Sequence, residues 1–202
     1  FNGEIYNFRE LRSQLVEKGY IFHGHSDTEV LLNLYLSVGK EMLSKLNGIY
    51  AFAIWDGNSE TLFVARDALG VKPLYYFEKE GIFTFASEIK ALLELTHIDK
   101  ELDLEAINRY LAFLWCPGKA TPLTSVKKLL PGEALIVEKG KIKEKWQWYQ
   151  LPIFRITKNN LSKNDAITGV EFHLRQAVQR QMVADVPLGA FLSGGLDSSA
   201  VV

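Results

Sequence analysis

The residues best suited to chemistry lie near the end of the 202-residue sequence, where residues 190–200 read Ala-Phe-Leu-Ser-Gly-Gly-Leu-Asp-Ser-Ser-Ala. The pattern predicts a short buried strand, a tight loop and the first turn of a helix. Gly194 and Gly195 can adopt positive φ and let their N–H groups converge on an anion. Ser198 and Ser199 follow at the expected helix N-terminus, where the dipole and free amides favour negative charge. The string therefore predicts a phosphate-binding loop.

The loop differs from the Walker type, because no lysine follows the glycines. Gly-Gly or Ser-Ser alone would indicate only a helix cap, whereas the whole string after an apolar run is far more specific. It resembles the pyrophosphate-binding loop of the ATP-pyrophosphatase superfamily, whose members activate carboxylates or carbonyls as adenylates. The resemblance implies an ATP site formed by Leu192, Ser193, Gly194, Gly195, Leu196, Asp197 and Ser198. Asp197 would ligate Mg²⁺; the alternative is a first-turn carboxylate that the helix dipole favours.

Three further strings stand earlier: Asn-Gly-Glu-Ile-Tyr-Asn at residues 2–7, Ser-Asp-Thr-Glu at 26–29, and Arg-Asp-Ala-Leu-Gly-Val-Lys-Pro-Leu-Tyr at 66–75. Followed by the phosphate loop in that order, they resemble glutamine-dependent asparagine synthetase over essentially the whole chain. In that family an N-terminal-nucleophile (Ntn) glutaminase domain releases ammonia from glutamine. An internal tunnel delivers the ammonia to a second domain, which makes β-aspartyl-AMP from aspartate and ATP.

The resemblance assigns roles to four residues of the glutaminase part. Amide hydrolysis needs hydrogen-bond donors aimed at the developing oxyanion, and the Asn2 side chain with the Gly3 backbone N–H would supply them while contacting glutamine. Glu4 and Asp27 match the family positions that bind the glutamine α-ammonium group. Standing alone, Glu4 would indicate a solvated turn carboxylate and Asp27 a helix cap. Together at the family spacing they indicate the glutamine site.

Several features depart from the family pattern. The family's glutaminase nucleophile is the first residue of the mature chain, whereas this sequence opens at Phe1. The family's arginine for the glutamine carboxylate would precede Phe1, and the sequence stops at Val202, so we expect a fragment lacking both ends and inert as a glutaminase. Cys116 is internal and is interpreted as a half-buried apolar residue. Residues 116–119 differ from the aromatic- and proline-rich segment expected in common asparagine synthetases, which leaves the acceptor carboxylate open.

Two helices are predicted before residue 40. The first begins after Asn7, which forms a predicted capping box with Glu10. The second is capped by Ser26 or Asp27, and Gly39 would end it.

From residue 47 the pattern changes to strands. Alternating apolar residues and Gly-containing turns predict three hairpins, over 50–56 and 61–67, 74–78 and 82–87, and 133–138 and 141–148. Ser87 and Glu88 are interpreted as the cap of a short helix, and residues 104–115 as an amphipathic helix. Packed hairpins beside helices predict an α+β fold, and the resemblance implies an Ntn hydrolase-type layered sandwich of antiparallel sheets and helices.

The chain is predicted to contain one domain and the beginning of another. Residues 1–150 would form a glutamine amidotransferase type 2 domain without its first part. Residues 151–163 are the best linker candidate, because they contain Pro152 and show no clear period. Residues 164–202 would begin an α/β ATP-pyrophosphatase domain, of the adenine nucleotide α-hydrolase-like type, with Ser162 capping a helix over 164–182. The apolar face of that helix consists of Ile167, Val170, Leu174 and Val178.

Composition limits the class of protein. The chain is 48% hydrophobic and 23% charged, as in ordinary globular proteins, and its net charge of −1 gives no argument for nucleic-acid or membrane partners. It has no apolar run of about 18 residues, and its single cysteine fits a reducing compartment, so we expect a cytoplasmic protein. The four histidines lack metal-ligand spacing. Family members often dimerise through the glutaminase domain, which leaves a homodimer open.

Together the motifs predict an ATP- and Mg²⁺-dependent ligase: a glutamine-hydrolysing asparagine synthetase that converts glutamine, aspartate and ATP to asparagine, glutamate, AMP and pyrophosphate. Three alternatives stay open. A related amidotransferase would use another carboxylate acceptor. A β-lactam synthetase-like enzyme would close its adenylate internally, and a non-catalytic binding module would keep the scaffold without the chemistry.

Overall fold

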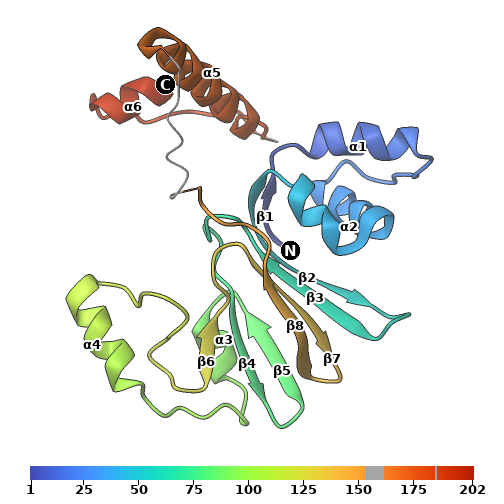
Figure 1. Cartoon of the computed structure of the whole chain (residues 1–202), viewed down its shortest axis with the longest axis vertical. Helices are drawn as coiled ribbons and strands as arrows, with labels where there is room; N and C mark the ends of the chain where they lie inside the picture. The colour runs from blue at the N-terminus through green and yellow to red at the C-terminus, as the bar shows by residue number, and fades with distance from the viewer. Residues whose placement is uncertain (153–161, 185) are drawn as a thin grey trace. The chain divides into compact units, whose positions relative to one another are not determined.

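The structure is a computed structural model of the chain, and it describes residues 1–152, 162–184 and 186–202. The chain divides into two compact units, Phe1–Gln150 and Leu151–Val202 (Figure 1). Most of the predicted linker, residues 151–163, lies outside the described residues, so the linker stays a prediction. No helix in the described ranges combines the length and apolar character needed to cross a membrane.

The described first unit contains strands and helices in mixed order. Its strands are β1 (Asn2–Ile5), β2 (Gly48–Asp56), β3 (Thr61–Arg66), β4 (Tyr75–Lys79), β5 (Ile82–Ala86), β6 (Val126–Lys128), β7 (Glu133–Glu138) and β8 (Lys141–Gln147). Its helices are α1 (Phe8–Glu17), α2 (Asp27–Val38), the 3₁₀ helix η1 (Gly39–Lys45), α3 (Ile89–Leu93) and α4 (Leu104–Phe113). The three predicted hairpins are confirmed as β2–β3, β4–β5 and β7–β8. The short β6 and η1 leave no periodic pattern in the sequence, and the predictions lack them.

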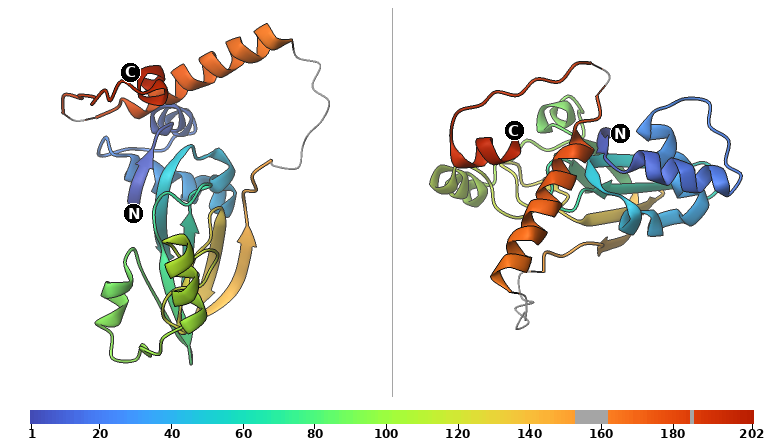
Figure 2. Two further views of the ribbon diagram at one scale, coloured as in Figure 1. Left: turned by 90° about the vertical axis from the view of Figure 1, so that its left-hand side faces the viewer. Right: turned by 90° about the horizontal axis from the view of Figure 1, so that it is seen from above.

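Two antiparallel sheets form the frame of the first unit. The larger sheet has the strand order β1-β2-β3-β7-β8, and the smaller has the order β5-β4-β6. Helices α1 and α2 pack on the outer face of the larger sheet, as Figure 2 shows. The smaller sheet packs on its other face, and α3 covers the far face of the smaller sheet. The result is an α+β layered sandwich, as predicted.

Alternation along the strands explains how each sheet serves two apolar layers. Successive side chains of a strand point to opposite faces. On β3, Phe63 packs in the cluster with α1 and α2, whereas Val64 packs between the sheets. On β4, Tyr76 packs between the sheets, whereas Phe77 packs with α3.

The first helix begins after Asn7 as predicted, but without the predicted capping box. Asn7 is the N-cap residue of α1, but its side chain makes no capping hydrogen bond. Its Nδ2 donates to the Lys45 carbonyl at 2.9 Å, and its Oδ1 accepts from the Asn47 N–H at 2.9 Å. The capping box with Glu10 is therefore wrong, because the Asn7 amide instead ties the start of α1 to the segment that leads into β2.

The second unit contains α5 (Lys163–Gln181) and α6 (Leu196–Val201). Ser162 caps α5 as predicted, with its hydroxyl accepting from the Asp165 N–H at 3.2 Å. The predicted apolar face of α5 is present in the sequence but not buried in this unit, since Ile167 and Val170 are both exposed.

The buried strand predicted before the phosphate loop does not form. Residues 186–195 adopt no regular secondary structure, and Phe191 and Leu192 are exposed. A parallel strand is stable only beside hydrogen-bonded neighbours that bury its faces. The described residues of the second unit contain no other strand to pair with it, so this prediction is wrong for the chain as described.

Candidate functional site

The first candidate site is built on β1, at the edge of the larger sheet. Asn2 lies opposite Ala51 of β2, and Gly3 lies opposite Tyr50. Asn2 Nδ2 donates to the Ser87 hydroxyl, with 3.3 Å between nitrogen and oxygen. Because Ser87 directly follows β5, this hydrogen bond links the two sheets at the proposed oxyanion residue.

The N–H of Gly3 points to the free edge of β1. Tyr6 N–H donates to the Asn47 carbonyl on the β2 side, whereas Ile5 N–H turns the other way and donates to Asp27 Oδ2 at 3.0 Å. Backbone N–H groups alternate between the two sides of a strand, so Gly3 presents its N–H on the same side as Ile5. The proposed oxyanion donor and the Asp27 carboxylate therefore share one edge of β1.

Gly3 occupies a position that no larger residue fits. Its φ is +151°, and a Cβ there would lie 2.1 Å from the Ile49 carbonyl oxygen and 2.6 Å from Tyr50 Cα. Both atoms belong to the backbone of β2, which cannot yield as a flexible side chain can. Glycine is required here because β1 approaches β2 so closely.

Asp27 is the first residue of α2, and Ser26 is its cap. The Ser26 hydroxyl accepts from the Glu29 N–H at 3.3 Å. Of the two predicted capping residues, Ser26 therefore caps the helix. The Asp27 carboxylate is left to join the N-terminus of α2 to the end of β1.

Glu4 is exposed and, two residues after Asn2, lies on the same face of β1. Burial is the main cause that raises the pKa of Tyr6, and the negative charges of Glu4 and Asp67 raise it further. The structure thus gathers Asn2, Gly3, Glu4 and Asp27 around one short strand. Their binding of glutamine stays a prediction.

Two cavities open beside the start of β1. One, of about 230 Å³, is lined by Asn2 and Ser87, among others. The other, of about 460 Å³, is lined by Ser26 and Thr28, among others. Phe1 lines both cavities, so the Asn2 amide borders open space rather than a packed core.

The loop after β3 is held by one buried carboxylate. Asp67 accepts backbone N–H groups at 3.0–3.3 Å from Tyr50, Leu69, Val71 and Lys72. This arrangement shapes the loop at residues 66–75 and leaves the Asp67 carboxylate no role at the β1 site.

The second candidate site is the loop that precedes α6. Gly194 has a φ of +76°, and a side chain there would meet nothing within 4 Å. Glycine is therefore favoured by the positive φ and not by a lack of space for a side chain. Gly195 is the N-cap of α6, and the hydroxyls of Ser193 and Ser198 hydrogen bond at 2.7 Å. The predicted loop and helix are present. Phosphate binding by residues 192–198 stays a prediction.

The residues present fit a phosphate-bound Mg²⁺ rather than a metal held by protein alone. Asp197 lies in the first turn of α6. In the described ranges, no three His, Cys, Asp or Glu side chains gather closely enough to hold a metal ion. Mg²⁺ at nucleotide sites is typically held by one or two carboxylates together with phosphate oxygens, and Asp197 can supply one.

Ser87 is the neighbour of the site that sequence patterns do not reveal. Of the predicted cap, Glu88 is the N-cap residue of α3, but no side-chain capping hydrogen bond forms there. The Ser87 hydroxyl accepts from Asn2 instead. Eighty-five positions separate the two residues, and only the packing of the two sheets brings them together.

Comparisons with known proteins identify the families that the chain matches. Residues 1–149 match the family model described as glutamine amidotransferase domain, and residues 169–202 match the one described as asparagine synthase. Asparagine synthetase [glutamine-hydrolyzing] 1 of Bacillus subtilis (strain 168) is 42% identical over 203 residues, which cover 100% of this chain and 31% of that protein. Asparagine synthetase [glutamine-hydrolyzing] 3 of the same strain is 40% identical over 205 residues, covering 100% and 32%.

A solved structure of similar fold is the glutamine phosphoribosylpyrophosphate amidotransferase from B. subtilis, complexed with ADP and GMP. It is 26% identical with a TM-score of 0.50, over 74% of this chain and 28% of that chain. The first unit is thus an Ntn-type layered sandwich. The chain spans about a third of the length of the curated relatives it matches.

Proposed function

This chain belongs to the glutamine amidotransferase domain family, and on that premise we propose that it is part of a glutamine-hydrolysing asparagine synthetase. Residues 1–150 form the glutaminase domain, residues 151–163 a linker, and residues 164–202 the beginning of the ATP-dependent domain. One observation carries the proposal: matches to a glutamine amidotransferase domain and to asparagine synthase follow each other in one chain. The pair suits an enzyme that transfers ammonia from glutamine to an activated acid.

In the glutaminase domain, β1 holds and orients glutamine. The Asn2 side chain and the Gly3 N–H donate to the oxyanion that develops at the amide carbon. An Asn amide nitrogen carries two N–H donors. The Ser87 hydroxyl takes one of them and fixes the rotation of the carboxamide, which leaves the other for the oxyanion. Glu4 and Asp27 bind the α-ammonium group of glutamine.

In the second domain, the loop at residues 192–198 holds the phosphates of ATP, and Asp197 ligates Mg²⁺. ATP supplies the adenylyl group that activates the acceptor carboxylate, and a Mg²⁺ held there would offset the negative charge of the phosphates. The free N–H groups of Gly195 and the residues after it orient these phosphates. The enzyme acts in the cytoplasm on glutamine, aspartate and ATP.

The test measures four products in one reaction. The full-length protein is incubated with ATP, Mg²⁺, glutamine and aspartate, and glutamate, AMP, pyrophosphate and asparagine are assayed together. We expect all four, with asparagine, AMP and pyrophosphate in equal amounts and each dependent on aspartate. A parallel reaction with ammonium chloride in place of glutamine tests the synthetase half alone.

The alternatives predict different product sets. If glutamate and pyrophosphate form only when another carboxylate is added, that carboxylate is the acceptor in place of aspartate. Cleavage of ATP without glutamate would favour an enzyme that closes its adenylate internally. Neither glutamate nor pyrophosphate with any carboxylate would reject the proposed enzyme and leave a binding module.

A further inference from the structure

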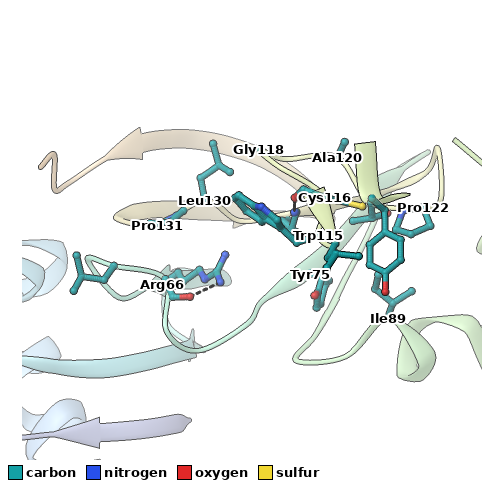
Figure 3. A pocket seen from close by; sticks show the side chains of 16 residues that line it. Arg66, Tyr75, Ile89, Trp115, Cys116, Gly118, Ala120, Pro122, Leu130 and Pro131 are labelled. Carbon is teal, nitrogen blue, oxygen red and sulfur yellow. Dashed lines mark hydrogen bonds between the residues drawn. The ribbon is translucent and has the colours of Figure 1, made fainter. Parts of the chain in front are cut away.

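A larger cavity lies in the first unit and shares no lining residue with the β1 site. Its volume is about 710 Å³, and its walls come from the loop after β3, from α4 and from the segment around β6 (Figure 3). Binding sites for small molecules commonly measure about 300–1,000 Å³. The cavity thus has the size of a ligand site, and the proposed asparagine synthesis does not use it.

The walls of this cavity are largely aromatic and aliphatic. Tyr75, Ile89 and Trp115 line it, as the close view shows, and Tyr110 and Leu114 add the end of α4. Trp115 is 59% exposed and Leu114 is 81% exposed. Such exposed apolar side chains around a cavity suit the flat apolar body of a ligand.

Two cations stand in the same walls without an acidic partner. The Arg66 guanidinium donates to the carbonyls of Lys72, Leu129 and Gly70 at 2.6–2.7 Å, which holds it rigidly. Lys128 donates to the Cys116 carbonyl, and its Nζ lies 5.6 Å from the centre of the Trp115 ring. Among the described residues neither cation forms an ion pair, and no Asp or Glu lines the cavity.

Placing these two cations together is unfavourable unless an anion accompanies them. Burial is the main cause that lowers the pKa of Lys128; Cys116 opposes this shift, and the charge of Arg66 lowers the pKa further. Burial also lowers the pKa of Arg66, and the negative charges of Asp67 and Tyr75 oppose that shift. The neighbouring Asp67 directs its carboxylate to backbone N–H groups and does not line the cavity. An anion bound between the two cations would offset their repulsion.

We propose that this cavity binds a small aromatic molecule that carries an oxyanion. The flat body lies against Trp115 and Tyr75, and the oxyanion faces Arg66 and Lys128. A guanidinium held in one orientation suits an oxyanion because its N–H groups form a planar fork. Lys128 adds a second charge beside it, so the site selects an anion over a neutral molecule of the same shape.

The test uses Cys116, whose side chain lines the cavity as a free, half-buried thiol. Cys116 of the full-length protein is alkylated with uncharged iodoacetamide, and the rate is followed on its peptide by mass spectrometry. The reaction is repeated with 8-anilinonaphthalene-1-sulfonate and with N-phenyl-1-naphthylamine, which has the same rings and no sulfonate. We expect the sulfonate to slow alkylation at a concentration roughly tenfold below that of the neutral probe.

Lys128 and Lys127 supply matched variants on one strand. Lys128 lines the cavity, whereas Lys127, its neighbour on β6, is exposed and lies on the opposite face. Lys128→Met should weaken protection by the sulfonate roughly tenfold, the factor of one charge-assisted hydrogen bond, and should leave the neutral probe unchanged. Lys127→Met should behave as wild type with both probes.

Three results would overturn the proposal. Equal protection by the two probes would show that charge does not matter. Equal effects of the Lys127 and Lys128 variants on protection would show that the anion does not bind inside the cavity. A Cys116 that resists alkylation without any probe would show that another part of the full-length protein covers the cavity, which excludes a small-molecule ligand.

Discussion

At the scale of single residues, the candidate glutamine site depends on where a few polar groups point. The N–H groups of a strand alternate between its two edges, and Ile5 N–H donates to Asp27 on the free edge of β1. Gly3, two residues earlier, therefore presents its N–H on that same edge. The Asn2 amide is oriented by Ser87. One backbone donor and one side-chain donor are thus placed beside each other on β1, and the residue that follows β5 orients the side-chain donor.

Ser87→Ala should slow glutamine hydrolysis. Loss of one neutral hydrogen bond leaves the Asn2 carboxamide free to rotate, so kcat should fall about three- to tenfold with a smaller change in KM. Ser87→Thr keeps the hydroxyl and should retain most of the activity. Asparagine formation from ammonium chloride, which bypasses this site, serves as the internal control. Equal losses in both variants, with equal falls in Tm, would indicate a purely structural residue.

Gly3→Ala should destabilise the fold itself. The added methyl would collide with the backbone of β2, and we expect a loss of about 2–4 kcal/mol in the free energy of unfolding, measured by urea denaturation. Gly19→Ala is the matched control, since Gly19 also has a positive φ, of +89°, with nothing within 4 Å. That variant should lose only about 1 kcal/mol. Equal losses would mean that the close approach of β1 and β2 is not the constraint.

At the scale of elements, the N-terminus of α2 divides two tasks between adjacent residues. Ser26 satisfies the helix end, and Asp27 reaches the strand. Because the cap is already supplied, the Asp27 carboxylate is not needed for the helix to begin. It lies in the first turn of α2, beside the positive end of the helix dipole.

Asp27→Asn should raise the KM for glutamine about tenfold or more, because a charged partner of the α-ammonium group is lost. Folding stability should change little, since the amide oxygen can still accept from Ile5 N–H. Ser26→Ala should do the reverse, losing about 1 kcal/mol of stability with the cap and leaving KM unchanged. Steady-state kinetics and urea denaturation separate the two effects. An unchanged KM in Asp27→Asn would show that Asp27 does not bind the α-ammonium group of glutamine.

At the scale of the whole molecule, the two candidate chemistries reside in separate compact units. The β1 site belongs entirely to residues 1–150, and the phosphate loop belongs to residues 151–202. The two activities should therefore be separable by single substitutions.

Asp197→Asn should abolish most pyrophosphate formation and spare glutamine hydrolysis. Loss of a Mg²⁺ ligand should lower the synthetase rate at least about tenfold. Asp165→Asn is the matched control, since Asp165 is also an exposed carboxylate in the first turn of its helix, and it should leave both activities intact. Pyrophosphate and glutamate are measured in the same reactions. Undiminished pyrophosphate formation would exclude Asp197 as a metal ligand.

Much of the local structure could be predicted from the sequence. The three hairpins follow from alternating apolar residues and tight turns, and Ser162 caps α5 through a contact three residues away. Where predictions fail, the outcome depends on a distant partner that either competes or is missing. Asn7 gives up its capping role because Asn47 and Lys45 are available to its amide. The strand predicted before Gly194 fails because a strand needs a neighbour, and no local pattern supplies one.

The sequence by itself determined the turns, the helix starts, the alternating faces and the motifs that carry the family resemblance, because each depends on contacts within a few residues. Tertiary structure decided which groups meet. The Asn2–Ser87 hydrogen bond joins a strand of one sheet to the residue that follows a strand of the other, and the cavity of Arg66, Trp115 and Lys128 joins three separate segments. Such contacts between distant residues depend on how the layers stack, which is a property of the whole apolar core and of no single motif.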